Sequence, residues 1–169
     1  MSLPQRTEAA PYYFTYIDRI SGDDILQTLE AQLADTSRFL SGISEEKSVY
    51  RYAPDKWSIR QVIGHVNDTE RVFAFRAMWF ARGLSEPLPS FDQNIASNAD
   101  GADNRSLASH VQEFRKIREA TIVLFRNLPA EAWVRSGVAS GNSVTVNALA
   151  YIIAGHMAHH LAILRERYL

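Results

Sequence analysis

Three of the five histidines in this chain fall within five residues near its C-terminal end: His156, His159 and His160. His156 and His160 are four residues apart, and on an α-helix this spacing places two side chains on one face, with Cβ atoms about 5–6 Å apart. Two imidazoles in this arrangement can ligate one metal ion without distorting the backbone. His159 is rotated by about 100° from His160 around the helix axis, so it need not share their ligand.

The helix that carries this pair is expected between Thr145 and Leu169, and its apolar stripe passes through both histidines, from Leu149 and Ile153 to Ile163. Imidazoles in an apolar stripe need polar partners, because an unpaired buried polar group costs free energy. A metal ion would supply them. A backbone carbonyl or a water is the alternative, and it is the usual one for a single core histidine.

A second expected helix begins at the clearest start signal in the chain. Ser58 is followed three residues later by Gln61, which is the pattern of a capping box. The helix is predicted from Ile59 to about Arg82, because Gly83 is a natural C-terminal stop.

His65 lies among the apolar residues of this second helix, whose core stripe is predicted to contain Val62, His65, Val72, Phe75 and Trp79, with Thr69 between them. Asp68 can share a face with His65 and could accept a hydrogen bond that orients it. The interpretation we favour for Asp68 is a solvated charge or an ion pair with Arg71 or Arg76.

Three other residues near candidate sites are given simpler roles. Gly64 would let another helix or a ligand approach closely, and we weigh these two alternatives equally. Glu70 is expected in a surface ion pair, and His110, near the start of the third helix, is expected on the surface.

Apolar residues at helical spacing predict four long helices and no strand. They are expected at Asp23 to about Leu40, with Ser21 or Asp23 as the cap, and at 59–82, 106–128 and, after a cap at Ser143 or Thr145, to the end of the chain. One domain over 1–169 fits this length. The predicted fold class is therefore all-α, a four-helix bundle with crossover connections.

The segments between these helices are expected to be irregular. Residues 1–20 should form an arm whose aromatic side chains anchor it to the bundle, and 42–57 should form a linker. The connection 84–105 is longer than a compact bundle needs, so it is expected to act as a lid or pocket wall, with Phe91 and Ile95 as anchors.

Composition excludes several classes of function. The net charge is -1 with both signs interspersed, which gives no electrostatic reason to expect nucleic acid as a partner. The chain has no cysteine, so disulfides, thiolate ligands and a cysteine nucleophile are excluded. No signal peptide and no membrane-spanning run is recognisable. We therefore expect a cytoplasmic protein.

If the second and fourth helices are neighbours, His65, His156 and His160 converge. Three neutral nitrogen ligands and a free position are typical of a catalytic metal site. The ligand set does not select among zinc, nickel, copper and iron. Met157 stands where a zincin would have its glutamate, and the paired GluXxxXxxHis motifs of di-iron bundles are missing. Both absences disfavour peptidase and di-iron chemistry.

Three stretches of the chain resemble the DinB/YfiT-like superfamily of metal-binding four-helix bundles: residues 56–76, which begin LysTrpSerIleArg, residues 81–92, and residues 151–167, which contain GlyHisMetAlaHisHis. The resemblance implies a metal site at His65, His156 and His160. It implies a divalent ion, zinc or nickel first and iron or manganese as alternatives. Dimers also occur in this superfamily, so a homodimer is one expectation.

The resemblance leaves two kinds of function open. The first is an enzyme, a metal-dependent thiol S-transferase or hydrolase, in which the ion activates a low-molecular-weight thiol or a water against a small-molecule substrate. The thiol would have to be a cosubstrate, because the chain has no cysteine. The second is a non-catalytic module of a stress response that binds a metal or a small molecule.

Overall fold

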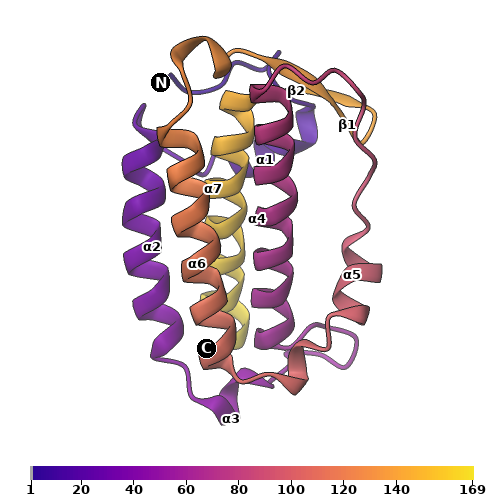
Figure 1. The fold of residues 1–169 in the computed structure, drawn as a ribbon. Coiled ribbons are helices and arrows are strands. Elements are labelled where there is room, and N and C mark those ends of the chain that lie inside the picture. The colour runs from indigo at the N-terminus through magenta and orange to yellow at the C-terminus, as the bar shows by residue number, and fades with distance from the viewer. Residues whose placement is uncertain (1) are drawn as a thin grey trace.

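A computed structural model describes residues 2–169 of the chain, and four long helices form its body (Figure 1). They are α2 (Ile25–Ser41), α4 (Ile59–Ala81), α6 (Leu107–Arg126) and α7 (Val146–Ile163). The prediction of a four-helix bundle is confirmed. No helix among residues 2–169 is both long and apolar enough to cross a lipid bilayer.

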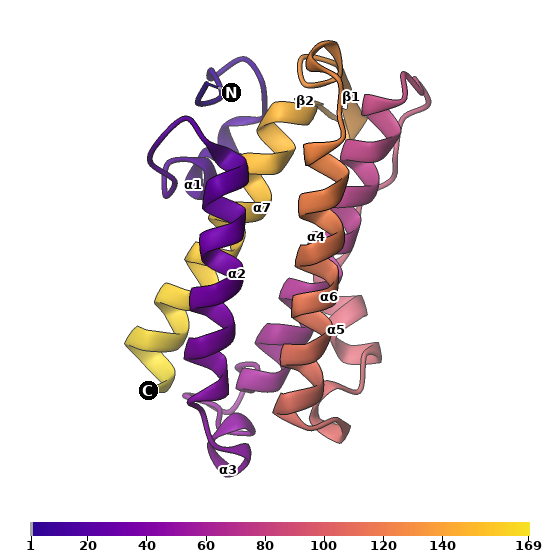
Figure 2. The ribbon, with the colours of Figure 1, turned by 60° about the vertical axis from the view of Figure 1, so that its left-hand side comes forward.

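The order of the helices around the bundle differs from their order in the chain. α4 packs against α6 and α7, and α2 packs against the same two helices. α2 therefore lies diagonally across the bundle from α4, and α6 from α7, whereas α4 and α6 are neighbours joined by a long connection, which confirms the predicted crossover connections. The chain runs down α2 and α7 and up α4 and α6 in the view of Figure 1, and Figure 2 shows the same arrangement from the side.

This topology explains the long connection between α4 and α6. The two helices run in the same direction, so the chain must return along the whole bundle before α6 can begin. α4 has 23 residues and is about 34 Å long. The returning segment contains α5 (Gln93–Ala99) and a 3-10 turn at Ala102–Asn104. Ile95 is 69% exposed, so its predicted role as an anchor is wrong, whereas Phe91 is half-buried.

The capping box at the start of α4 is confirmed. The Ser58 hydroxyl accepts a hydrogen bond from the backbone N–H of Gln61 at 3.0 Å, and the Gln61 side chain accepts one from the Ser58 N–H at 3.1 Å. Thr145, one of two candidates, caps α7 by accepting from the N–H of Ala148 at 3.0 Å. These caps fix where both histidine-bearing helices begin.

The cap of α2 is Asp24, so the prediction of Ser21 or Asp23 is wrong. The Asp24 carboxylate accepts from the N–H of Gln27 at 2.9 Å. All these residues can cap a helix, and the choice depends on where the chain turns into the bundle.

The predicted core stripe of α4 is confirmed at Val62, His65 and Thr69, but beyond Thr69 the buried face differs from the predicted one. Phe75 is 47% exposed and stacks against Trp79 on the outside, with ring centroids 5.6 Å apart. The buried face continues in steps of three and four through Val66, Thr69, Phe73, Ala77 and Phe80. The prediction was wrong because it selected the large apolar side chains, whereas the buried face follows the helical period of 3.6 residues.

The sequence predicted no strand, and this prediction is wrong. β1 (Ser136–Ala139) and β2 (Asn142–Thr145) form an antiparallel hairpin in the connection between α6 and α7. Ser140 and Gly141 at its turn have φ values of 53° and 76°, as a type I′ turn requires. Leu88 pairs with the hairpin through hydrogen bonds to Val138 and Ser140.

The N-terminal arm is partly helical and lies on α7. Its aromatic segment forms a 3-10 turn, Pro11–Tyr13, followed by α1 (Phe14–Ile17). A Cβ at Gly155 would collide with the backbone carbonyl of Tyr16, so the glycine permits this close approach. The contact places the arm beside the histidines of α7.

The remaining connections carry short elements. The linker 42–57 contains α3 (Glu45–Ser48). A Cβ at Gly64 would collide with the carboxylate of Asp100, so this glycine admits the segment after α5 rather than a neighbouring long helix or a ligand. The chain ends in a π-helical turn at Leu164–Tyr168.

Candidate metal centre

The packing of α4 against α7 brings three histidines to one point. The Nε2 atom of His156 lies 3.1 Å from Nε2 of His65 and 3.1 Å from Nε2 of His160. One ring nitrogen from each residue lies within 4.8 Å of the other two. His65 and His156 are buried and His160 is half-buried. The three residues named from the sequence are therefore brought together.

The spacing of these nitrogens fits a single metal ion. Zn²⁺ binds histidine nitrogens at about 2.0–2.1 Å in tetrahedral geometry, which sets two such nitrogens about 3.3–3.4 Å apart. The observed 3.1 Å is close to this value for two of the three pairs. Small rotations of the rings would complete the geometry.

Hydrogen bonds among the three rings cannot replace a cation. A neutral imidazole has one N–H and one lone pair. Nε2 of His156 faces two other Nε2 atoms, and it can form a hydrogen bond with only one of them. In the other of these two contacts, no proton lies between the two nitrogens, so their lone pairs repel each other. A single cation, in contrast, accepts the lone pairs of all three nitrogens.

The electrostatic environment keeps these imidazoles in the neutral form that ligates metals. Burial lowers the pKa of His65 from 6.5 to about 4, with a smaller contribution from the charge of His159. Burial lowers the pKa of His160 to about 3, and it also holds the pKa of His156 well below its ordinary value. None of the three needs to lose a proton at neutral pH before it binds an ion.

Neighbouring side chains hold the rings in place. Nδ1 of His65 lies 3.3 Å from the hydroxyl of Thr69, one helical turn later, so an Nδ1–H donated to this oxygen leaves Nε2 free. The ring of Trp57 lies 4.9 Å from the ring of His65, and the ring of Tyr16 lies 5.2 Å from that of His156. His159 makes an edge-to-face contact with Tyr16 and lies outside the cluster of three.

Thr69→Val should weaken metal binding, because it keeps the shape of the side chain and removes the oxygen that orients His65. Loss of such an outer partner typically lowers metal affinity by about 10–100-fold. A competition titration against a chromophoric zinc chelator would measure the change. Thr69→Ser, which retains the hydroxyl, is the matched control, and equal affinities for Thr69→Val and wild type would contradict the assignment.

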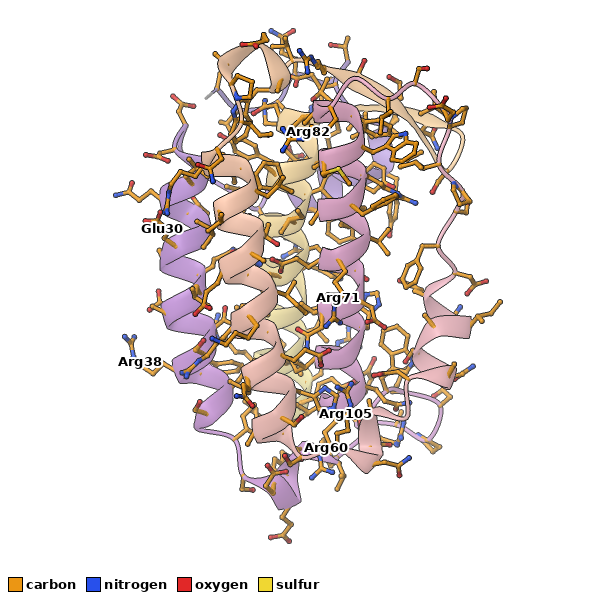
Figure 3. The ribbon with its side chains drawn as sticks, in the orientation of Figure 1. Glu30, Arg38, Arg60, Arg71, Arg82 and Arg105 are labelled. Atoms are coloured by element: carbon orange, nitrogen blue, oxygen red, sulfur yellow. The ribbon has the colours of Figure 1, made fainter. Side chains whose placement is uncertain are left out.

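Asp68 does not contact His65, so the favoured interpretation of an ion pair is confirmed. Its carboxylate lies 3.3 Å from Arg71, which also binds Glu113 at 2.7 Å. Arg105 binds the second oxygen of Glu113 at 2.8 Å. Arg71 and Arg105 lie along the same side of the bundle in Figure 3.

Two predictions of surface positions are wrong. Glu70 is buried and forms an ion pair with the buried Arg118. His110 is fully buried, and its Nε2 atom donates to the carbonyl of Ala102 at 2.9 Å. Both residues are polar, and their partners come from other elements, so helical spacing alone could not reveal their burial.

Two pockets reach the histidine cluster from different sides. A pocket of about 210 Å³ is lined by His156 together with Thr69, Arg76 and the aromatic arm. A second pocket of about 250 Å³ is lined by His160 together with Lys56, Trp57 and two tyrosines. The first two residues of α5 line one pocket each, Gln93 the first and Asn94 the second.

The sequence did not reveal several residues of this site. The aromatic residues of the arm were interpreted as packing anchors, which is confirmed for Phe14, Tyr13 and Tyr16, but Tyr12, Tyr13 and Tyr16 also line the first pocket. Thr69 was predicted only as part of the core stripe, and its contact with His65 could have been found from its position four residues later, which puts the two side chains on one face.

Comparisons with solved structures agree with this fold. YfiT from Bacillus subtilis, described as a probable metal-dependent hydrolase with an unusual four-helix bundle topology, is 17% identical; the similarity covers 96% of this chain and 91% of YfiT, with a TM-score of 0.64. A mycothiol-dependent maleylpyruvate isomerase is 14% identical with a TM-score of 0.69, and the similarity covers 86% of this chain but only 61% of the isomerase.

The comparison of sequences identifies the family. No curated protein matches the chain. The profile of the DinB superfamily matches residues 28–164, which include all four long helices except the first residues of α2, and all three clustered histidines. The chain belongs to the DinB superfamily.

Proposed function

We propose that this protein is a metal-dependent enzyme in which His65, His156 and His160 hold one divalent ion, zinc or nickel first. The ion would activate a low-molecular-weight thiol or a water for transfer or hydrolysis. The observation that carries this proposal is the convergence of three neutral imidazole nitrogens at a point that two partly polar pockets reach.

Three protein ligands leave a coordination position for an exchangeable molecule, which distinguishes catalytic from structural zinc sites. A bound divalent ion supplies a positive charge that lowers the pKa of a thiol or water and polarises an electrophile. The chain's own contribution is to hold the three nitrogens, through Thr69 and through the rings of Trp57 and Tyr16.

Two pockets at one centre suit a reaction between two molecules. A cosubstrate thiol could enter by one pocket and an electrophile by the other, so that the thiol loses its proton, its sulfur bonds to a carbon near the histidines, and the leaving group on that carbon departs with the bonding electrons. The chain contains no cysteine, so the sulfur must come from a small molecule. The mycothiol dependence of one structural neighbour supports a thiol, and the description of YfiT supports water.

A non-catalytic metal-binding module is the alternative, and the pockets disfavour it. A site that only stores or senses a metal needs no space beside its ligands. Here His156 and His160 each line a separate pocket.

Turnover that depends on the metal would test the proposal. Protein loaded with zinc or nickel would be assayed with glutathione, cysteine, mycothiol or bacillithiol against 1-chloro-2,4-dinitrobenzene, and without thiol against nitrophenyl esters. We expect activity in the loaded wild type and in His159→Ala, and none in His160→Ala. Activity that persists in metal-free His160→Ala would refute the proposal, and metal binding without turnover across the panel would favour the module.

A further inference from the structure

Arg76 is a buried cation without an acidic partner. Its side chain is 4% exposed, and no carboxylate within residues 2–169 lies close enough to form an ion pair with it. Arg118, the other arginine at this depth, is paired with Glu70 through two hydrogen bonds of 2.8 and 2.9 Å. Burial of a charge is costly unless an opposite charge or several hydrogen bonds compensate for it.

The hydrogen bonds that Arg76 makes leave most of its donors unused. Nη2 donates to the carbonyl of Pro89 at 2.9 Å and to the hydroxyl of Ser140 at 3.0 Å. Both partners are neutral and come from the segments that cover this end of α4. A guanidinium has five N–H donors, and only the two on Nη2 are used here. The donors of Nε and Nη1 have no hydrogen-bond partner within residues 2–169. These contacts position the group without neutralising it.

The unused donors belong to a residue that lines the pocket beside His156. Thr69, Phe73 and Arg76 follow one another along the same face of α4, and all three line this pocket. Arg76 lies toward the C-terminal end of the helix and Thr69 toward the histidines. A molecule held by Arg76 would therefore extend along α4 toward the metal centre.

The walls and size of the pocket restrict what Arg76 could hold. Phe73 and three tyrosines of the arm supply aromatic surface, and no acidic residue lines the pocket. Its volume of about 210 Å³ is below the roughly 300–1,000 Å³ typical of sites for drug-sized ligands. A small molecule with an anionic group and an apolar or aromatic body matches these properties.

We propose that Arg76 binds the carboxylate of a small organic acid in this pocket and directs the rest of the molecule toward His156. Arg forms strong charge-assisted hydrogen bonds with carboxylates. This inference rests on the proposed function only for the reaction of the acid's other end at the metal centre; the binding of its carboxylate by Arg76 does not depend on that function. The carboxylate could belong to the electrophile or to the cosubstrate thiol, and both sources require the same contact with Arg76.

Binding of paired acids and amides would test this proposal. Calorimetric titrations of the zinc-loaded protein would use benzoate and succinate as thiol-free probes, N-acetylcysteine as the thiol probe, and the amide of each as its neutral control. Wild type would be compared with Arg76→Gln and with Arg82→Gln, which changes an exposed arginine at the end of the same helix (Figure 3).

We expect at least one acid to bind wild type and Arg82→Gln, and to bind Arg76→Gln at least about tenfold more weakly, as the loss of a charged hydrogen bond implies. The amides should not discriminate between these proteins. The probe whose affinity falls in Arg76→Gln identifies the molecule that carries the carboxylate. A weaker affinity for benzoate or succinate indicates the electrophile, and a weaker affinity for N-acetylcysteine alone indicates the thiol. Equal affinity of every acid for wild type and Arg76→Gln, or no binding by any acid, overturns the proposal.

A second measurement on the wild type removes any dependence on the folding of Arg76→Gln. The Nε–H resonance of Arg76, assigned by comparison with Arg76→Lys, should shift as the acid is added and should give the same dissociation constant. A resonance that does not move overturns the proposal. The same titration on chelator-treated protein distinguishes failure of this proposal from failure of the proposed function. Carboxylate binding that depends on Arg76 should persist even if no metal-dependent turnover is found.

Discussion

Replacement of any one of His65, His156 and His160 by alanine should reduce the bound divalent metal from about one ion per chain to none after dialysis. Each residue supplies one of three converging nitrogens, and two ligands cannot hold the ion as a set of three does. The loss should exceed the roughly 10–100-fold weakening expected for an outer partner such as Thr69.

Elemental mass spectrometry of protein purified without added metal or affinity resin would measure this content. His159→Ala is the matched control, because His159 is on the same helix but outside the cluster. It should keep the wild-type content. A wild-type protein that stays empty after zinc, nickel, manganese and iron are offered would mean that the histidines are only polar groups of the core. The functional proposal would then fail, while carboxylate binding by Arg76 could still be tested.

The parts of the site that could be predicted from the sequence depend on local geometry. His156 and His160 share a face because they are four residues apart, and the capping box of Ser58 and Gln61 fixes the start of α4 and so the phase of His65. The convergence of the three histidines was predicted on the condition that the two helices are neighbours, and the packing of α4 against α7 meets this condition. These inferences need only helix periodicity and the rule that buried imidazoles have partners.

The parts that could not be predicted depend on contacts between distant segments. The hairpin has a local signal, because Ser140 and Gly141 form a Ser-Gly turn between short alternating runs, but such short runs rarely suffice to predict strands. His110 is buried because the segment after α5 returns along α4 and presents the carbonyl of Ala102. Helical spacing contains no information about that segment. Arg76 was considered only as a possible partner of Asp68, and its contacts with Pro89 and Ser140 could not be predicted for the same reason.

Glu70→Gln should be among the most destabilising substitutions in the chain, although Glu70 was expected on the surface. Its carboxylate binds both Nε and Nη2 of Arg118, whose side chain is fully buried. Nη1 of Arg118 donates to Gln32 at 2.9 Å, and Gln32 donates to the carbonyl of Ala154 at 2.9 Å. This network joins α2, α4, α6 and α7, so loss of its only carboxylate leaves a cation in the centre of the bundle.

Removal of one partner of a buried ion pair typically costs about 3–5 kcal/mol. Arg38→Ala provides the contrast: its partner Asp35 lies at 3.1 Å, but both side chains are largely exposed, and Arg38 points away from the bundle in Figure 3. Such pairs contribute about 0–1 kcal/mol. Urea unfolding of metal-free protein would measure both free energies without interference from metal binding.

The double variant Glu70→Leu with Arg118→Met tests whether the cost arises from an unpaired charge or from the loss of the pair itself. Replacement of both partners by apolar groups removes the charge that Glu70→Gln would leave unpaired, so the double variant should be more stable than Glu70→Gln alone. If it is less stable, the hydrogen bonds to Gln32 and Ala154 matter more than the charge. If Glu70→Gln itself costs no more than Arg38→Ala, the side chain is not held at the buried position described here.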